Sequence, residues 1–176
     1  MVSLIFVFWM YVVLFAIIGG MRGWAKELLV SFSVILALTF TTLITNYIPF
    51  IRDVLQKDNK VLFFWFRSLI LALVVFFGYQ TPNISRFAAK MTRERIQDIL
   101  LGVVIGALNG YLIAGTLWFY LDQASYPFTN FISTPTGEIA NMSKAMLEYM
   151  PPRLLGIPGI YFAVVIAFIF VIVVFI

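Results

Sequence analysis

The chain has 176 residues, of which 62% are hydrophobic and only 11% are charged, and its formal net charge is +4. Soluble domains average about 45–50% apolar and about 25% charged residues, so soluble, disordered and fibrous classes are excluded and an integral membrane protein remains. The absence of cysteine and histidine excludes disulfides, thiol nucleophiles, Cys/His metal sites and histidine acid–base chemistry. We therefore expect no catalytic residue, no metal and no cofactor. We also expect no nucleic-acid partner, because the basic residues form no cluster in the sequence.

A membrane-spanning helix needs about 20 predominantly apolar residues. Unbroken runs of this length are helices in a bilayer, because only helices and closed barrels satisfy their backbone hydrogen bonds there. We predict one all-α domain, a polytopic transmembrane bundle with about five spans, at residues 2–20, 28–50, 61–79, 99–121 and 159–176. No basic residue precedes the first run and no small-residue cleavage site follows it, so we expect it to be retained. The fifth run ends without a polar anchor, so we expect more residues after it.

The connection between the first two spans is short and polar. Its notable residues are Arg22, Gly23, Trp24, Lys26 and Glu27, preceded by two further glycines. We predict a tight turn on the cytoplasmic side, with basic residues as anchors and Trp24 in the interfacial aromatic belt. Contact with lipid headgroups or with a partner is the alternative interpretation.

The third predicted span contains a single charge, Arg67. We expect its side chain to extend toward the interface at Lys60, or to pair with a helix-end carbonyl. A substrate-binding role is the alternative, because intramembrane charges are functional candidates. We expect no Asp or Glu inside the bilayer, since Asp98 and Asp122 lie at span ends. This absence argues against an ion-coupled transporter.

Small residues recur at every fourth position of the fourth predicted span: Gly102, Gly106, Gly110 and Ala114. On a helix this spacing forms one smooth stripe, which another backbone can approach closely. We predict a helix–helix seam, within the chain or between chains, rather than a chance abundance of glycine. Asn109 lies beside the stripe, near the middle of the span. We interpret it as an interhelical hydrogen-bonding residue worth about 1 kcal/mol, with a transport role as the alternative.

Two motifs in these segments resemble a known family. The first is Gly-x-x-Arg-Gly-Trp from Gly19, with Glu27 four residues after Gly23. The second is Asp-x-x-Leu-Gly-x-x-x-Gly-x-x-x-Gly, from Asp98 to Gly110. In this order and spacing they resemble the colicin V production protein family of small bacterial inner-membrane proteins, over about residues 2–126. The resemblance implies a four-span core to which the fifth span is an addition, and a link with colicin V export and envelope physiology. It implies no catalytic residues.

The longest predicted loop, residues 122–158, contains a short helix that starts near Ser133–Glu138 and is stopped by Pro151. Apolar residues recur along it at three- and four-residue spacing, at Ile139, Met142, Met146 and Tyr149, with Glu138, Asn141, Lys144 and Glu148 on other faces. This pattern predicts an amphipathic helix at the external membrane interface. A methionine-bearing stripe that docks a partner is the alternative.

The basic residues of the short loops predict the orientation, because cytoplasmic loops are enriched in Lys and Arg. The first and third loops contain six of them and the second contains three: Arg22, Lys26, Arg86, Lys90, Arg93 and Arg95, against Arg52, Lys57 and Lys60. We therefore predict a multi-pass protein of the bacterial inner membrane with its N-terminus outside and its C-terminus inside.

These observations favour a non-enzymatic protein with an accessory or scaffolding role in export or envelope maintenance. The expected partners are the lipid bilayer and other membrane protein subunits, or further copies of the chain. Two alternatives remain open. One is an oligomeric channel or transporter, although a channel needs polar residues along a continuous path and the sequence offers only scattered ones. The other is a structural subunit of a larger membrane complex, such as a photosynthetic or electron-transfer assembly.

Overall fold

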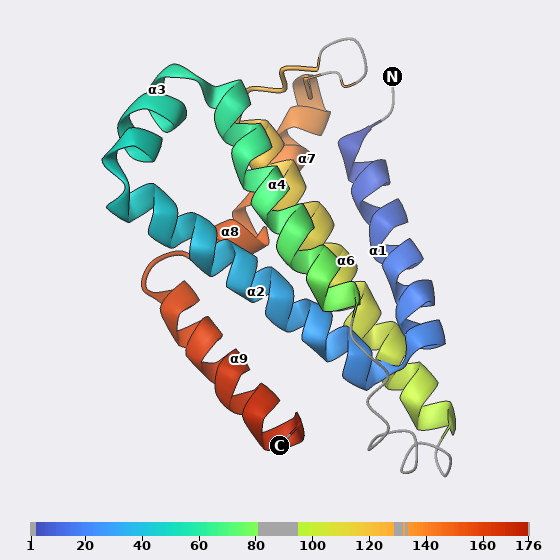
Figure 1. Ribbon diagram of the computed structural model, residues 1–176. Coiled ribbons are helices and arrows are strands. Elements are labelled where there is room, and N and C mark those ends of the chain that lie inside the picture. Colours follow the sequence, from blue (N-terminus) through green and yellow to red (C-terminus); the bar gives the residue numbers. More distant parts are fainter. Residues whose placement is uncertain (1–2, 81–94, 129–131, 133, 176) are drawn as a thin grey trace.

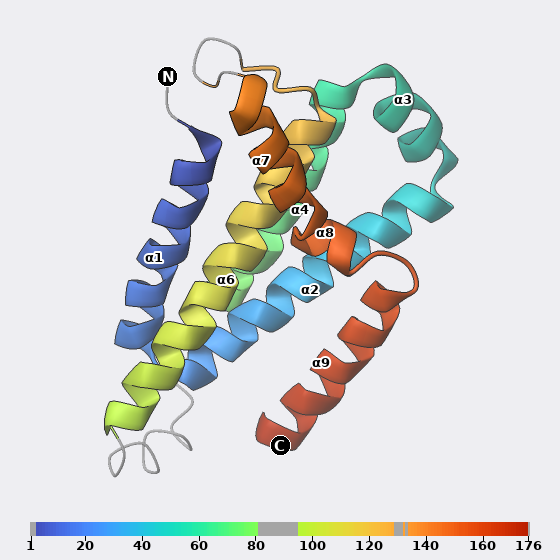
Figure 2. The ribbon, with the colours of Figure 1, turned by 180° about the vertical axis from the view of Figure 1, so that it is seen from behind.

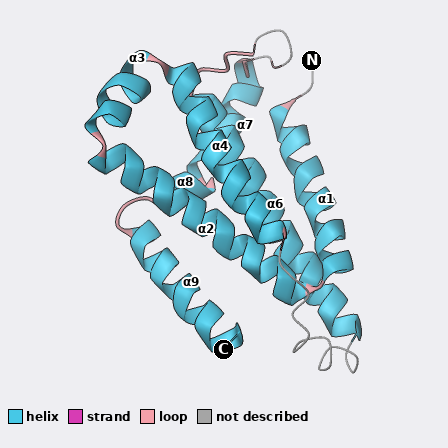
Figure 3. Ribbon diagram, in the orientation of Figure 1, coloured by secondary structure: helices cyan, strands magenta, loops and turns pink. Residues whose placement is uncertain are grey.

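The computed structural model describes residues 3–80, 95–128, 132 and 134–175. In these ranges the regular elements are helices and there is no strand, which confirms the all-α prediction (Figures 1 and 3). The elements are α1 (Leu4–Arg22), α2 (Trp24–Tyr47), η1 (Ile51–Leu55), α3 (Gln56–Asp58), α4 (Lys60–Tyr79), α6 (Arg95–Gln123), α7 (Gly137–Glu148), α8 (Pro151–Leu154) and α9 (Gly159–Phe175). Arg86, Lys90 and Arg93, on which the predicted orientation partly depends, lie outside the described residues.

Four helices of the described chain are long and apolar enough to cross a membrane: α1, α2, α4 and the part of α6 from Ile96. Helix α9 is also apolar but shorter. The starts of α1, α4 and α9 lie within two residues of the predicted spans. Helices α2 and α6 each begin four residues earlier than predicted, at Trp24 and Arg95. As a result the polar residues just before the second predicted span are helical.

The two ends of the bundle are occupied by different elements (Figure 1). The start of α1, helix α3 and the start of α7 lie at one end, which we call the α3 end. The ends of α1 and α4 and the start of α6 lie at the other, which we call the Gly23 end after the residue between α1 and α2. Helix α9 runs toward the Gly23 end.

Helix α2 is the central element of the described bundle. It packs against α4 and α6 and also against α9. Of its candidate span 44% is buried, compared with 11% for α1. Each threonine hydroxyl of α2 donates to the carbonyl four residues earlier, at 2.8 Å in Thr39, Thr41, Thr42 and Thr45. These hydroxyl protons are therefore satisfied without water.

The main apolar core lies where α2 meets α4 and α6. Val30 and Val34 of α2 are fully buried, and they cluster with Leu71 and Val75 of α4 and Leu112 of α6. Much of the outer surface is also apolar. Such a surface suits contact with lipid chains, which are as apolar as leucine side chains.

The predicted external loop contains helical structure that packs into the bundle. Helix α7 runs from the α3 end toward the middle of the bundle (Figure 2). At its end the Tyr149 carbonyl accepts a hydrogen bond from the Tyr111 hydroxyl, in the middle of α6. Met150 follows and lies against Gly115, where a Cβ atom would be 2.7 Å from the methionine sulfur. Pro151 then begins α8, which leads to α9.

The face of α7 that packs inward differs from the predicted apolar stripe. The buried side chains of the helix are Ser143 and Leu147, and of the stripe only Met146 packs against the core. Three stripe residues are exposed, by 51% in Ile139, 55% in Met142 and 67% in Tyr149. The apolar stripe thus faces mostly outward, as it does in a helix that contacts the membrane interface, and the interfacial placement of α7 stays a prediction.

Candidate functional site

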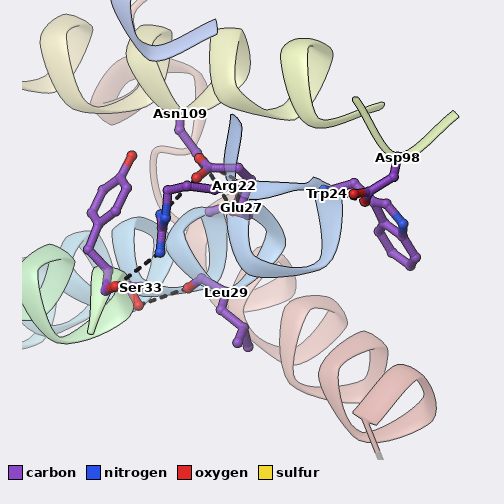
Figure 4. A network of polar contacts seen from close by, with 9 residues as sticks. Arg22, Trp24, Glu27, Leu29, Ser33, Asp98 and Asn109 are labelled. Atoms are coloured by element: carbon purple, nitrogen blue, oxygen red, sulfur yellow. Dashed lines mark hydrogen bonds and ion pairs between the residues drawn. The ribbon is translucent and has the colours of Figure 1, made fainter. Parts of the chain in front are cut away.

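A cluster of polar side chains joins the four long helices inside the bundle (Figure 4). Arg22 Nη1 at the end of α1 donates to Glu27 Oε1 in the first turn of α2 at 2.7 Å. Arg22 Nη2 donates to the carbonyl of Tyr79, the last residue of α4, at 3.0 Å. Asn109 Nδ2, in the middle of α6, donates to Glu27 Oε2 at 2.8 Å and to the Glu27 carbonyl at 2.9 Å. The Glu27 carboxylate thus connects α1, α2 and α6, and the hydrogen bond from Arg22 to the Tyr79 carbonyl connects α4 to this group. We call this group the Glu27 cluster.

The polar groups of the Glu27 cluster satisfy one another. Glu27 and Asn109 are completely buried. The Ser31 hydroxyl, one turn after Glu27, donates to Asn109 Oδ1 at 2.6 Å, so the amide uses both its oxygen and its nitrogen. The Arg22 guanidinium, whose side chain is 21% exposed, lies 4.3 Å from the centre of the Tyr79 ring. Charge-assisted hydrogen bonds on both carboxylate oxygens offset the cost of removing Glu27 from water.

One glycine sets the start of α2 and so brings Glu27 into the bundle. Gly23 ends α1 with φ +86°, a left-handed conformation that glycine adopts without strain. Asp98 Oδ1 accepts a hydrogen bond from the Trp24 backbone N–H at 3.2 Å, which places a carboxylate at the positive end of α2. A Cβ atom on Gly23 would lie 2.7 Å from Asp98 Oδ2. Helix α2 therefore begins at Trp24, and Glu27 lies in its first turn.

The predicted turn and the predicted lack of buried acids both need correction. The break between the helices is a single residue, Gly23, and Glu27 is a fully buried acid in a candidate span. The prediction fails because a count of apolar residues starts the second span after the last charge that precedes the apolar run, which leaves Glu27 outside it. Of the other turn residues, Trp24 contributes its backbone N–H, while Lys26 is half-buried and forms no ion pair with the described residues.

The glycine stripe of α6 faces α1. Gly102 packs against Gly19, and a Cβ atom on Gly102 would collide with the Gly19 carbonyl. A Cβ atom on Gly106 would collide with the Phe15 carbonyl and lie 2.9 Å from Gly19 Cα. On Gly110 it would lie 2.8 Å from another α1 backbone carbon. Backbone atoms cannot give way as a flexible side chain can, so glycine is the residue that fits these positions.

The other two predicted packing residues have different surroundings. Ala114 lines an apolar cavity of about 290 Å³ between α1, α4 and α6, where the close approach of the glycines has ended. Asn109 bonds to α2 rather than to α1. The five predicted positions therefore serve two interfaces of α6 and one cavity.

Arg67 is 6% exposed, and it lines one cavity together with Lys60. Its Nη1 donates to Gln123 Oε1 at the end of α6, at 2.6 Å. Its Cζ lies 4.0 Å from the ring centre of Phe63 and 4.1 Å from that of Tyr120. The predicted helix-end carbonyl is therefore replaced by a side-chain amide and two aromatic faces.

The described residues offer few groups suited to metal binding or catalysis. The part of the chain that the structure describes contains no group of three or more His, Cys, Asp or Glu residues that could hold a metal. Both oxygens of the buried carboxylate are already occupied by donors. The Glu27 cluster has the geometry of a structural contact that holds the helices in position.

The family model described as "Colicin V production protein" matches residues 6–147. The chain belongs to the colicin V production protein family. No curated protein and no solved structure matches the chain. The matched region of this colicin V production family member covers the four long helices and α7 almost to its end, so α8 and α9 lie outside it.

The two segments that carry the resemblance to the colicin V production family meet in space. The contacts between them include Gly19 with Gly102, Trp24 with Asp98, and Glu27 with Asn109. Motif residues on both segments thus help to hold α1, α2 and α6 together, and Asn109, at an unspecified position of the second motif, adds to these contacts. Their spacing has a structural explanation that needs no catalytic role.

Proposed function

We propose that this member of the colicin V production family is a non-enzymatic accessory or scaffolding component in export or envelope maintenance. The supporting observation is that the Glu27 cluster is closed on itself, with Glu27 and Asn109 fully buried and each polar atom of their side chains hydrogen-bonded. Such a cluster fixes four helices relative to one another. A bundle held in this way suits a platform that holds partners in place.

A channel or transporter is less well supported, because it presents polar groups to a continuous aqueous path. The cavity beside α1 is lined mainly by apolar residues. The polar cavity beside Arg67 shares no lining residue with the Glu27 cluster. The described residues therefore offer two separate polar regions rather than one path.

The export role is tested in a bacterial host that produces colicin V and lacks its own family member. We expect expression of this chain to restore colicin V in the culture medium. The variant Glu27→Ala should restore less, because the helices lose their common contact, whereas Glu138→Gln, at an exposed position of α7, should restore as much as the wild type. Absence of restoration by wild-type protein that is present in the membrane would contradict the export role.

Flux measurements separate the scaffold from the channel. The purified chain is reconstituted into liposomes loaded with potassium and with a small fluorescent anion. We expect leakage equal to that of empty liposomes. Leakage that grows with the amount of protein and falls in a cavity variant such as Thr41→Val would favour the channel and contradict the scaffold.

A further inference from the structure

Arg67 is a buried cation for which the described residues provide no anionic partner. None of the ion pairs of the described chain includes it. Its one hydrogen-bond partner is the neutral amide of Gln123, and its Nε is buried without a partner. Breaking or omitting the partner of a buried charge is costly, and each unsatisfied buried donor calls for an explanation. An anion that enters from outside would satisfy both the charge and Nε.

Two cavities meet at Arg67, at the α3 end of the bundle. The first, of about 180 Å³, lies between α2, α4, α6 and α8, and its polar lining residues are Thr41, Thr42, Thr45, Asn46, Gln56, Arg67, Tyr120 and Gln123. The second, of about 190 Å³, is lined by Gln56, Lys60, Phe63, Arg67 and Gln123. Lys60 adds a second positive charge, and neither cavity has an Asp or Glu among its described lining residues.

The hydrogen-bond donors of these cavities suit an oxyanion. The threonine hydroxyl protons are already donated to helix carbonyls. Among the described residues Arg67 Nε has no hydrogen-bond partner, and Arg67, Lys60 and Gln56 all line the second cavity. Guanidinium and ammonium groups form short, charge-assisted hydrogen bonds to phosphate oxygens. Basic pockets between membrane helices near a bilayer surface are places where lipid headgroups bind.

We propose that the two cavities around Arg67 form a binding site for a phosphate group, with Arg67 as its fixed anchor and Lys60 as its second cation. The phosphate belongs either to the headgroup of an anionic lipid or to free inorganic phosphate. This site goes beyond the scaffolding role, and its failure would leave that role intact because no residue of the Glu27 cluster lines it.

The two sources of phosphate are distinguished in two arms with the purified full-length chain. In the first arm, sodium phosphate is titrated into protein in neutral detergent at constant ionic strength, with sodium chloride as the control, and binding is measured by calorimetry. In the second arm, the chain is placed in nanodiscs of phosphatidylcholine with or without phosphatidylglycerol, and retained lipid is identified by native mass spectrometry. Binding in the first arm assigns free phosphate. Selective retention of phosphatidylglycerol without phosphate binding assigns the headgroup.

Three variants test the assignment in whichever arm shows binding. Arg67→Met should weaken binding at least about tenfold, and Lys60→Gln about threefold, because each removes one charge-assisted contact. Arg52→Gln is the matched control, since Arg52 is exposed and already paired with Asp53. It should change the affinity less than about twofold.

The variant Gln123→Glu keeps the test decisive if Arg67→Met does not fold. It places a carboxylate where the amide now accepts from Arg67 Nη1 at 2.6 Å. This internal counter-ion should raise the thermal stability and weaken phosphate or headgroup binding at least about tenfold. Wild-type protein that binds neither ligand, or a Gln123→Glu variant that binds as tightly as the wild type, would overturn the proposal.

Discussion

Removal of the Glu27 carboxylate should destabilise the bundle by a large and graded amount. Glu27→Ala leaves Arg22 Nη1 and Asn109 Nδ2 without their side-chain acceptors. Loss of one partner from a buried ion pair costs about 3–5 kcal/mol. Because the Arg22 side chain is 21% exposed and can turn toward water at the end of the bundle, we expect a value near about 3 kcal/mol. Glu27→Gln keeps an acceptor for Asn109 but loses the charge, so we expect about 1–2 kcal/mol.

The free energy of unfolding is measured by titration of SDS into mixed detergent micelles, with helicity as the signal. Glu138→Gln is the control, and at its exposed position it should change stability by less than about 0.5 kcal/mol. A double-mutant cycle with Arg22→Met isolates the pair. The double variant Arg22→Met/Glu27→Gln should be more stable than the sum of the single effects by about 1–2 kcal/mol, because it leaves no unpaired charge.

Two results would refute this reasoning. If Glu27→Ala unfolds at the same SDS fraction as Glu138→Gln, then the carboxylate is not buried among the helices. If the effects of Arg22→Met and Glu27→Gln are additive, then the two side chains do not form an ion pair.

Three further predictions concern packing and orientation. Gly106→Leu should lower the free energy of unfolding by at least about 1–3 kcal/mol in the same SDS titration, because the new side chain meets α1 backbone. The control Val104→Leu, at a position that is 65% exposed, should be nearly silent. Equal stability of the two variants would exclude the α1–α6 seam. Ser143→Ala should be neutral or stabilising by up to about 1 kcal/mol, because the buried Ser143 hydroxyl has no partner among the described residues. Ser31→Ala should cost about 1 kcal/mol, because it removes the hydrogen bond to Asn109. A larger loss of stability for Ser143→Ala than for Ser31→Ala would contradict the packing of α7. In intact cells an impermeant thiol reagent should label Thr136→Cys and spare Ser85→Cys, and the reverse pattern would invert the predicted orientation.

The sequence predicts the positions of the four long helices well, because 20 apolar residues in a bilayer have few alternatives to a helix, whereas α9, the fifth predicted span, is shorter than these four. It fails where a charge lies inside a span. Glu27 precedes the second apolar run, which predicts a turn at this residue, although Ser31 follows one helical turn later on the same face. A helix that starts directly after Gly23 places both side chains toward Asn109. The combination of a turn glycine, an acid one turn later and an amide in another span is the signal that could have found the cluster.

The face of α7 and the partner of Arg67 could not be predicted, because both depend on which helices are neighbours. An apolar stripe identifies the buried face when the surroundings are water, but in lipid a large apolar side chain such as Ile139 is stable on either face. Arg67 is close to Lys60 along α4, and the two residues line one cavity. The end of α6 lies beside it, however, and Gln123 and Tyr120 supply a nearer environment.

The two ends of the bundle differ in what they leave available to a ligand. At the Gly23 end, the family segments contact each other through Trp24 and Asp98 and through the Glu27 cluster, and these contacts occupy the polar atoms of Glu27 and Asn109. At the α3 end, Arg67 keeps an unpartnered Nε beside two cavities. A group that has satisfied its donors and acceptors internally gains little from a ligand, whereas an unsatisfied buried cation gains a great deal. Recognition of a charged ligand is therefore expected at the α3 end, and the family segments maintain the helix arrangement that holds Arg67 in place.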